Sequence, residues 1–151
     1  MRNLNALLVL ALAAGCADSP GLCSHCPAIE GSYQLLCSDL SSTTPDCASL
    51  TPPAPPATIA ITRNGAELHT TLNGVPARGQ LTDTADFALV GTQDLGGDAG
   101  ALQTLTLRGF YVSGTARDGG TPAQLQVKWG THVERAGKFC DAERPCTATQ
   151  R

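Results

Sequence analysis

Aromatic and charged residues are scarce in this chain of 151 residues. Aromatic side chains make up 4% of it and charged side chains 15%, whereas it has 16 glycines and 10 prolines. That balance fits short strands and turns better than a helical bundle. No cluster of lysine and arginine is present, which argues against nucleic acid as a partner because phosphate backbones bind grouped cations.

Signatures of catalysis are also missing from the sequence. It contains no Gly-x-Ser-x-Gly elbow, no glycine-rich phosphate loop and no His-Glu-x-x-His helix. Alternation with Leu68 places His69 on the solvent side of a strand, and His132 falls near a strand end. Neither histidine stands with a carboxylate and a nucleophile in the arrangement of a catalytic base. We therefore predict no catalytic residue, no cofactor, no bound metal and no enzyme activity.

A long apolar run lies at the start of the chain. It extends from Leu4 to Ala14, is interrupted only by Asn5 and follows the positive charge of Arg2. A membrane-spanning helix needs about 20 apolar residues, so this run is too short for a permanent anchor. Its length, its flanking charge and the small residues at its end are typical of an export signal that is later removed.

The end of this run resembles the lipobox of bacterial lipoproteins. It reads Leu12-Ala13-Ala14-Gly15-Cys16, with Ala13 in place of the usual leucine. In that family the cysteine thiol receives a diacylglycerol, the preceding peptide is removed and the new amine is usually acylated. The resemblance implies that Cys16 is lipidated and that two or three acyl chains hold the protein to a membrane, which is enough for stable anchoring.

The resemblance also implies a location in the bacterial cell envelope. Ala17 and Asp18, which follow the cysteine, do not match the signal for inner-membrane retention. This implies the outer membrane, on its periplasmic or surface face. The alternative is that Cys16 is a seventh structural cysteine behind an ordinary export signal.

Removal of residues 1–15 leaves 136 of the 151 residues, enough for one domain with a modest core. We expect a signal peptide at 1–15, a lipidated tether at 16–28 and a single domain at 29–151. Arg2 is the only charged residue removed, so 9 basic and 13 acidic residues leave a mature net charge of −4. The charges are scattered along the chain.

Six cysteines remain after Cys16, and an even number in an exported chain indicates three disulfides. They are Cys23, Cys26, Cys37, Cys47, Cys140 and Cys146. If the last strand closes a barrel against the first, the expected pairs are Cys37 with Cys146, Cys47 with Cys140 and Cys23 with Cys26. Local loops favour instead Cys37 with Cys47 and Cys140 with Cys146, and the sequence leaves both schemes open.

The Cys23-Ser24-His25-Cys26 stretch also supplies three of the ligands of a structural zinc site. A fourth ligand would have to come from a distant cysteine. In an oxidising compartment the cysteines would pair with one another instead, so we expect disulfides here and no metal.

Apolar residues recur with a period of two from Thr58 onward, which predicts half-buried strands. Asn64-Gly65 and Asn73-Gly74 carry the residues of tight hairpin turns. Further strands are expected at Ile29–Cys37 and Cys146–Gln150. The residues expected on one face are Ile59, Ile61, Ala66, Leu68, Leu72, Val75, Ala77, Gly79, Leu81, Phe87, Leu89, Leu105, Leu107, Tyr111, Leu125, Val127 and Trp129.

Four segments are expected to be loops. Residues 38–57 contain five prolines, which exclude a helix or a central strand and favour a stiff connection. Gly91–Gly100 holds Asp94 and Asp98 among glycines, a weak match to a calcium loop for which a hairpin loop is the default. The turn at 117–120 and the polar stretch Asp141, Glu143 and Arg144 complete the set.

About eight strands in sequential hairpins predict an all-β antiparallel meander that closes into a small, disulfide-stapled barrel. At residues 29–150 this architecture resembles the lipocalin-like and avidin-like barrels, and Gly31-Ser32-Tyr33 opens the first strand where lipocalins carry Gly, any residue, then Trp. The resemblance concerns architecture, and no binding residue is carried over from it.

The sequence favours a non-catalytic binding or interaction module held at the cell envelope. Barrels of about eight strands either fill with their own side chains or hold one small ligand. The expected partners are the membrane, through Cys16, and either a small apolar ligand or an envelope protein. A small-ligand carrier, a barrel of the protease-inhibitor kind and a structural envelope lipoprotein are the alternatives.

Overall fold

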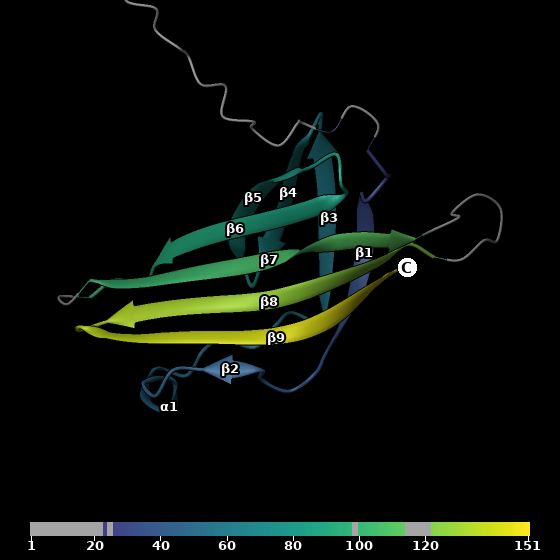
Figure 1. Ribbon diagram of the computed structural model, residues 1–151. Helices are drawn as coiled ribbons and strands as arrows, with labels where there is room; N and C mark the ends of the chain where they lie inside the picture. Colours follow the sequence, from purple (N-terminus) through teal and green to yellow (C-terminus); the bar gives the residue numbers. More distant parts are fainter. Residues whose placement is uncertain (1–22, 24–25, 98–99, 114–121) are drawn as a thin grey trace, which may run out of the picture.

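The computed structural model describes residues 23, 26–97, 100–113 and 122–151. Eight antiparallel strands follow one another around a barrel, and β9 pairs back onto β1 to close it (Figure 1). The strands are β1 Gly31–Cys37, β3 Thr58–Asn64, β4 Glu67–Leu72, β5 Val75–Leu81, β6 Asp86–Asp94, β7 Ala101–Ser113, β8 Gln124–Arg135 and β9 Lys138–Gln150. The predicted all-β meander and its closure are confirmed.

Tight turns set the register of the hairpins. Asn73 and Gly74 have φ values of 49° and 85° between the paired residues Leu72 and Val75, the conformation that an Asn-Gly turn supplies. In the preceding hairpin Asn64 is still paired, and the turn residues are Gly65, with φ of 63°, and Ala66. The first turn is therefore one residue later than the sequence pattern suggests, and Ala66 lies outside the strands.

The barrel interior is filled by the protein's own side chains. The largest fully buried ones are Trp129, Tyr33, Ile29, Ile61, Leu68, Leu72, Leu81, Leu89, Leu105, Leu107, Leu125 and Cys140. All but Cys140 belong to one cluster inside the barrel. Tyr33 Oη donates to the Ile29 carbonyl at 2.9 Å and Trp129 Nε1 donates to the Pro53 carbonyl at 3.3 Å, so both large polar side chains are satisfied.

The last three strands extend beyond the barrel. β7, β8 and β9 have 13, 12 and 13 residues, whereas β3, β4 and β5 have 7, 6 and 7. Beside the N-terminal half of β9 lie the two-residue strand β2 (Ser42–Thr43) and the short helix α1 (Cys47–Leu50) (Figure 1). Leu50 and Cys47 pack there against a second buried cluster of Val133, Cys140 and Ala142.

Three disulfides hold the chain together in the pattern that barrel closure predicts. Cys37–Cys146 joins β1 to β9, Cys47–Cys140 joins α1 to β9, and Cys23–Cys26 closes a local loop before β1. The alternative with local pairs is wrong, because antiparallel pairing places Cys37 directly opposite Cys146. Cys23 and Cys26 are likewise bonded to each other and are not free to bind zinc.

Two of the predicted loops are wrong in part. Asp141, Glu143 and Arg144 belong to β9, where Cys140, Ala142, Cys146 and Ala148 alternate on the buried side. These small residues give a weak hydrophobic pattern, so the flanking charges suggested a loop. Similarly, β6 continues to Asp94, and the connection to β7 begins only at Leu95.

The proline-rich segment 38–57 is not wholly irregular. It contains β2 and α1, which fit between the prolines because Cys47–Leu50 lies after Pro45 and before Pro52. The turn at 117–120, the signal peptide and Cys16 lie outside the described residues. Within the described ranges no helix is long and apolar enough to cross a membrane.

Candidate functional site

The outer surface of β5–β9 carries an open groove, which we call the outer groove. Its larger part, of about 980 Å³, is lined mainly by apolar surface and includes Arg78, Ala88, Val90, Arg108, Phe110 and Lys128. A smaller part of about 500 Å³ continues from it past Ala88, Val90 and Arg108 to the polar pair His132 and Asp141. Because successive strand residues face opposite sides, the outward members of these strands line the groove and the inward ones fill the barrel.

Glycine makes room in the smaller part of the outer groove. Gly130 lies on β8 between Thr106 of β7 and Glu143 of β9. A Cβ there would collide with the Thr106 hydroxyl, so this part of the outer face has no side chain of its own. On the inward side, a Cβ at Gly79 or Gly109 would collide with the backbone of the neighbouring strand. These two positions therefore require glycine for close strand approach.

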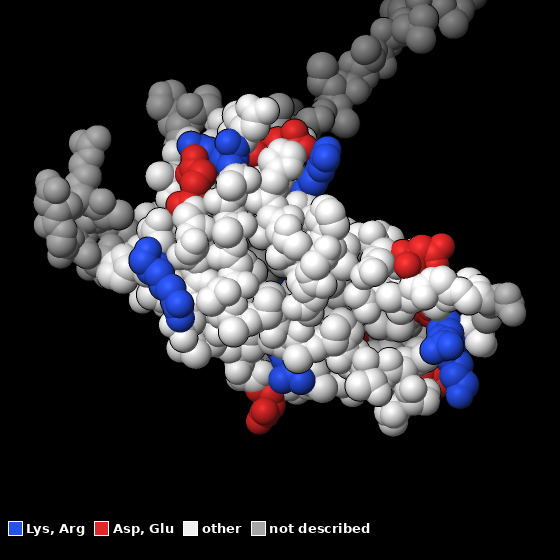
Figure 2. Space-filling view, turned by 180° about the vertical axis from the view of Figure 1, so that it is seen from behind, with Lys and Arg blue, Asp and Glu red and all other residues white. Residues whose placement is uncertain are grey.

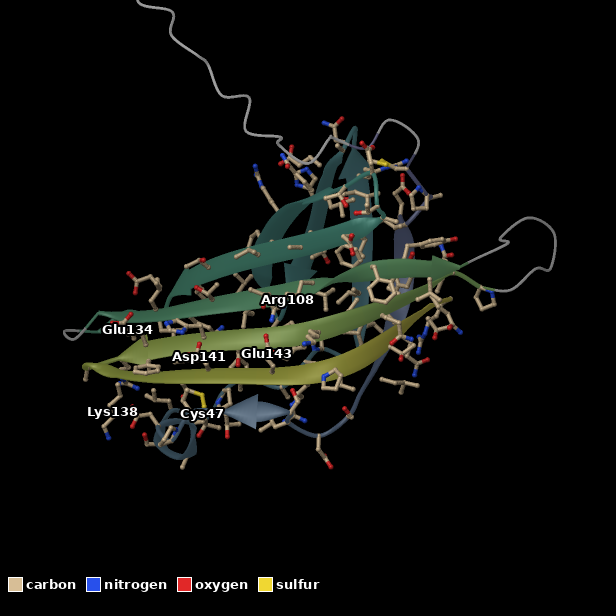
Figure 3. All side chains as sticks on the ribbon, viewed as in Figure 1. Cys47, Arg108, Glu134, Lys138, Asp141 and Glu143 are labelled. Carbon is tan, nitrogen blue, oxygen red and sulfur yellow. A yellow bond between two sulfur atoms is a disulfide. The ribbon has the colours of Figure 1, made fainter. Side chains whose placement is uncertain are left out.

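Two cations stand directly opposite each other at the edge of the outer groove. Arg108 of β7 pairs in register with Lys128 of β8, an arrangement that is unfavourable for like charges. Arg108 reaches across β8 to form an ion pair with Glu143 of β9 (Figure 3). Asp86 is the carboxylate that lines the larger part of the groove together with Arg78, Arg108 and Lys128. Among the described residues neither Lys128 nor Arg78 has an ion-pair partner, so this larger part keeps a formal excess of positive charge.

The smaller part of the groove holds a histidine–aspartate pair. His132 Nδ1 and Asp141 Oδ1 are 2.7 Å apart on neighbouring strands. Sequence reasoning missed this pair because it placed Asp141 in a loop. The signal was the Ala136-Gly137 turn, whose φ values of 52° and 74° bring Arg135 opposite Lys138 and hence His132 opposite Asp141.

A hydroxyl stands on the other side of the same histidine. Thr104 of β7 is the register partner of His132, so hydroxyl, imidazole and carboxylate lie in one row across three strands. In the part of the chain that the structure describes, no hydrogen bond joins Thr104 to the ring; its hydroxyl lies 3.4 Å from that of Thr92. The row therefore lacks the nucleophile–base contact of an activated hydroxyl.

The other residues singled out from the sequence do not gather into a site. His69 lies on the outer side of β4 with its side chain 35% exposed, as predicted. Its Nε2 atom is 3.6 Å from Oε1 of Glu67. Asp94 Oδ1 accepts a hydrogen bond from the Gly96 amide at 2.8 Å, which is a local turn contact. Asp98 and His25 lie outside the described residues. Across the described ranges no group of three or more His, Cys, Asp or Glu residues could hold a metal ion.

One tyrosine in the barrel has a shifted acidity. Burial raises the pKa of Tyr33 from 10.0 to about 12, with smaller contributions from Tyr111 and Glu30. Because this hydroxyl is bonded to the Ile29 carbonyl in the interior, the shift reflects packing of the barrel. It lies away from the outer groove.

The face of the molecule opposite the view of Figure 1 is mostly uncharged. Figure 2 shows lysine, arginine and acidic side chains at its margins around a broad area of other residues. That face offers little to an ionic ligand, in contrast to the outer groove. Comparison of the chain with protein-family models, curated proteins and solved structures finds no match.

Proposed function

We propose that the mature protein is a non-catalytic binding module, anchored to the bacterial outer membrane by acyl chains on Cys16. The sequence from Leu4 to Cys16 supports the anchor because it resembles an export signal that ends in a lipobox. The three disulfides support folding outside the cytoplasm, since such bonds persist in oxidising compartments.

The observation that carries the binding function is a filled barrel beside an unfilled outer groove. Trp129, Tyr33 and the leucines of the core occupy the interior in which a ligand carrier of this architecture would hold its cargo. The groove, by contrast, combines exposed apolar side chains with unpaired cations at one place on the surface. We therefore place the binding site on the outer face of β5–β9, where a small molecule or a segment of an envelope protein would lie.

The anchor is tested by the intact mass of the protein purified from its own membranes. We expect cleavage before Cys16 and a mass increase equal to two or three acyl chains with their glycerol. The matched control is C16S, which removes the acceptor thiol and should release the protein from the membrane fraction. An intact residue 1–15 segment, or an unmodified thiol at Cys16, would contradict the proposed anchor.

Occupancy of the groove is tested by photo-crosslinking in living cells. A benzoyl-phenylalanine replaces Phe110, which lines the groove, or Phe139, which lies on the same sheet near the β8–β9 turn. The two phenylalanines are 48% and 50% exposed, so they are matched in residue type and accessibility. We expect irradiation to give a discrete adduct at position 110 and none at 139. Equal labelling at both positions, or none at either, would contradict a binding role for the groove.

A further inference from the structure

The outer groove has two chemically distinct components, an apolar floor and a cationic edge. Val90 and Phe110 are 46% and 48% exposed, which is high for large apolar side chains. Ala88 lies beside them on β6, and the lining of the groove is mostly apolar. Contact with an apolar chain or ring would remove this surface from water, and burial of apolar surface is favourable.

The cationic edge lies next to this floor. Arg108 is opposite Lys128 in register, and Ala88 is the partner of Arg108 on the other side. Two facing cations repel each other, and an anion placed between them turns that repulsion into attraction. Glu143 relieves Arg108 alone, because Lys128 has no ion-pair partner among the described residues.

Resting on the function proposed above, we propose that the outer groove binds a single-chain amphiphile with one anionic group. Its apolar chain lies along Ala88, Val90 and Phe110, and its carboxylate lies between Lys128 and Arg108. Arg78, on the other side of the groove, adds to the positive potential. Arg78, Arg108 and Lys128 are exposed and line the apolar hollow, which has Asp86 as its carboxylate. This excess of cations beside apolar surface selects an anion over a cation or a neutral chain of equal length.

Glu143 has a defined part in this site. Its carboxylate holds Arg108 in the unliganded protein and competes with an incoming anion for the same guanidinium. Removing the Glu143 charge therefore frees Arg108 for the ligand. The proposal requires that loss of a carboxylate beside the groove tightens binding, whereas loss of the Lys128 charge weakens it.

Isothermal titration tests this with dodecanoate below its micelle concentration. The protein is the full chain carrying C16S, so that no attached acyl chain competes. Dodecan-1-ol and dodecylamine serve as neutral and cationic ligands of the same length. We expect dodecanoate to bind at least tenfold more tightly than either, and its affinity to fall as salt is added. Equal affinities for the three compounds would overturn the proposal.

Four variants locate the headgroup. K128Q should weaken dodecanoate binding by about tenfold, because it removes a charge-assisted hydrogen bond. E143Q should strengthen it by about threefold. K138Q and E134Q are the matched controls, since each removes the same kind of charge from β9 or β8 outside the groove (Figure 3). If K128Q behaves like K138Q, or E143Q like E134Q, the assignment of the headgroup site is wrong.

Three further outcomes bear on this inference and on the proposed function. Failure of dodecanoate to bind, with a Phe110 crosslink still formed in cells, would overturn the ligand class and leave the groove as a binding site. Failure of both would remove the proposed function as well. Binding to phosphatidylglycerol vesicles but not to dissolved dodecanoate would overturn the proposal in favour of docking on a membrane surface.

Discussion

Each of the two long-range disulfides should stabilise the protein less when the other is already present than when it is the first to form. Cys47–Cys140 lies within the loop closed by Cys37–Cys146, with sequence separations of 93 and 109 residues. When either bridge is present, the other closes only a short loop, because the chain path between its two cysteines runs through the existing bridge. That path has 10 residue steps from Cys37 to Cys47 and 6 from Cys140 to Cys146, or about 16 in all.

Loop entropy converts these lengths into stability. A first bridge, which closes a loop of 93 or 109 residues, lowers the entropy of the denatured chain by an amount equivalent to about 4.7 kcal/mol at 25 °C. The second bridge, across about 16 residues, contributes about 3 kcal/mol. Loss of either bridge alone should therefore cost about 3 kcal/mol, whereas loss of both should cost about 8 kcal/mol. The excess over two single losses is about 2 kcal/mol.

The measurement is a double-mutant cycle with C37A/C146A, C47A/C140A and the fourfold variant, unfolded in guanidinium chloride without reductant. Changes in burial from cysteine to alanine occur in both the single and the combined variants and cancel in the cycle. C23A/C26A is the control, because its separation of 3 residues limits its contribution to less than about 2 kcal/mol. Strict additivity of the two long-range bridges would refute the nested-loop reasoning, as would a single loss larger than the combined one.

Two further predictions concern the barrel itself. The pKa of Tyr33 is about 12 in the folded protein and 10.0 in the unfolded chain. The protonated hydroxyl therefore contributes fully to the free energy of unfolding below pH 10, and this contribution is lost as the pH rises through 12. At about 1.4 kcal/mol for each pKa unit, this loss of unfolding free energy approaches roughly 3 kcal/mol. The unfolding free energy of Y33F should not show this decline at alkaline pH. Parallel pH profiles for Y33F and the native chain would contradict the prediction. G109A should destabilise the protein by more than about 2 kcal/mol because its Cβ meets the Gln126 backbone, whereas G130A, whose Cβ meets only the movable Thr106 hydroxyl, should cost less than about 1 kcal/mol in thermal unfolding. Equal costs would argue against the close strand approach at Gly109.

The sequence was a good guide to the barrel wherever large apolar residues alternate. Ile59 and Ile61, or Leu125, Val127 and Trp129, leave no choice of face, because a shift of one residue would expose all of them. Barrel closure was predicted from the run of sequential hairpins, whereas the sequence left two disulfide schemes open, and only the pairing of the first strand with the last decides between them.

The smaller part of the groove could not be predicted, because it opens where β8 carries no side chain. Gly130 within β8 gives no hydrophobic signal, and its effect depends on Thr106 and Glu143 of two other strands. The His132–Asp141 pair could not be predicted either, because it forms only if β9 begins as early as Lys138. Cross-strand contacts require the register, and the register of β8–β9 depends on a short Ala-Gly turn with no asparagine or aspartate in it.

The position of the single tryptophan makes its fluorescence a probe of unfolding. Trp129 is 1% exposed, and its indole N–H is bonded to the Pro53 carbonyl in the segment that crosses from α1 to β3. Its fluorescence therefore senses two events, wetting of the core and detachment of that proline-rich crossing. Emission that changes before the circular dichroism of the strands would identify the crossing as the part that opens first, without any added label.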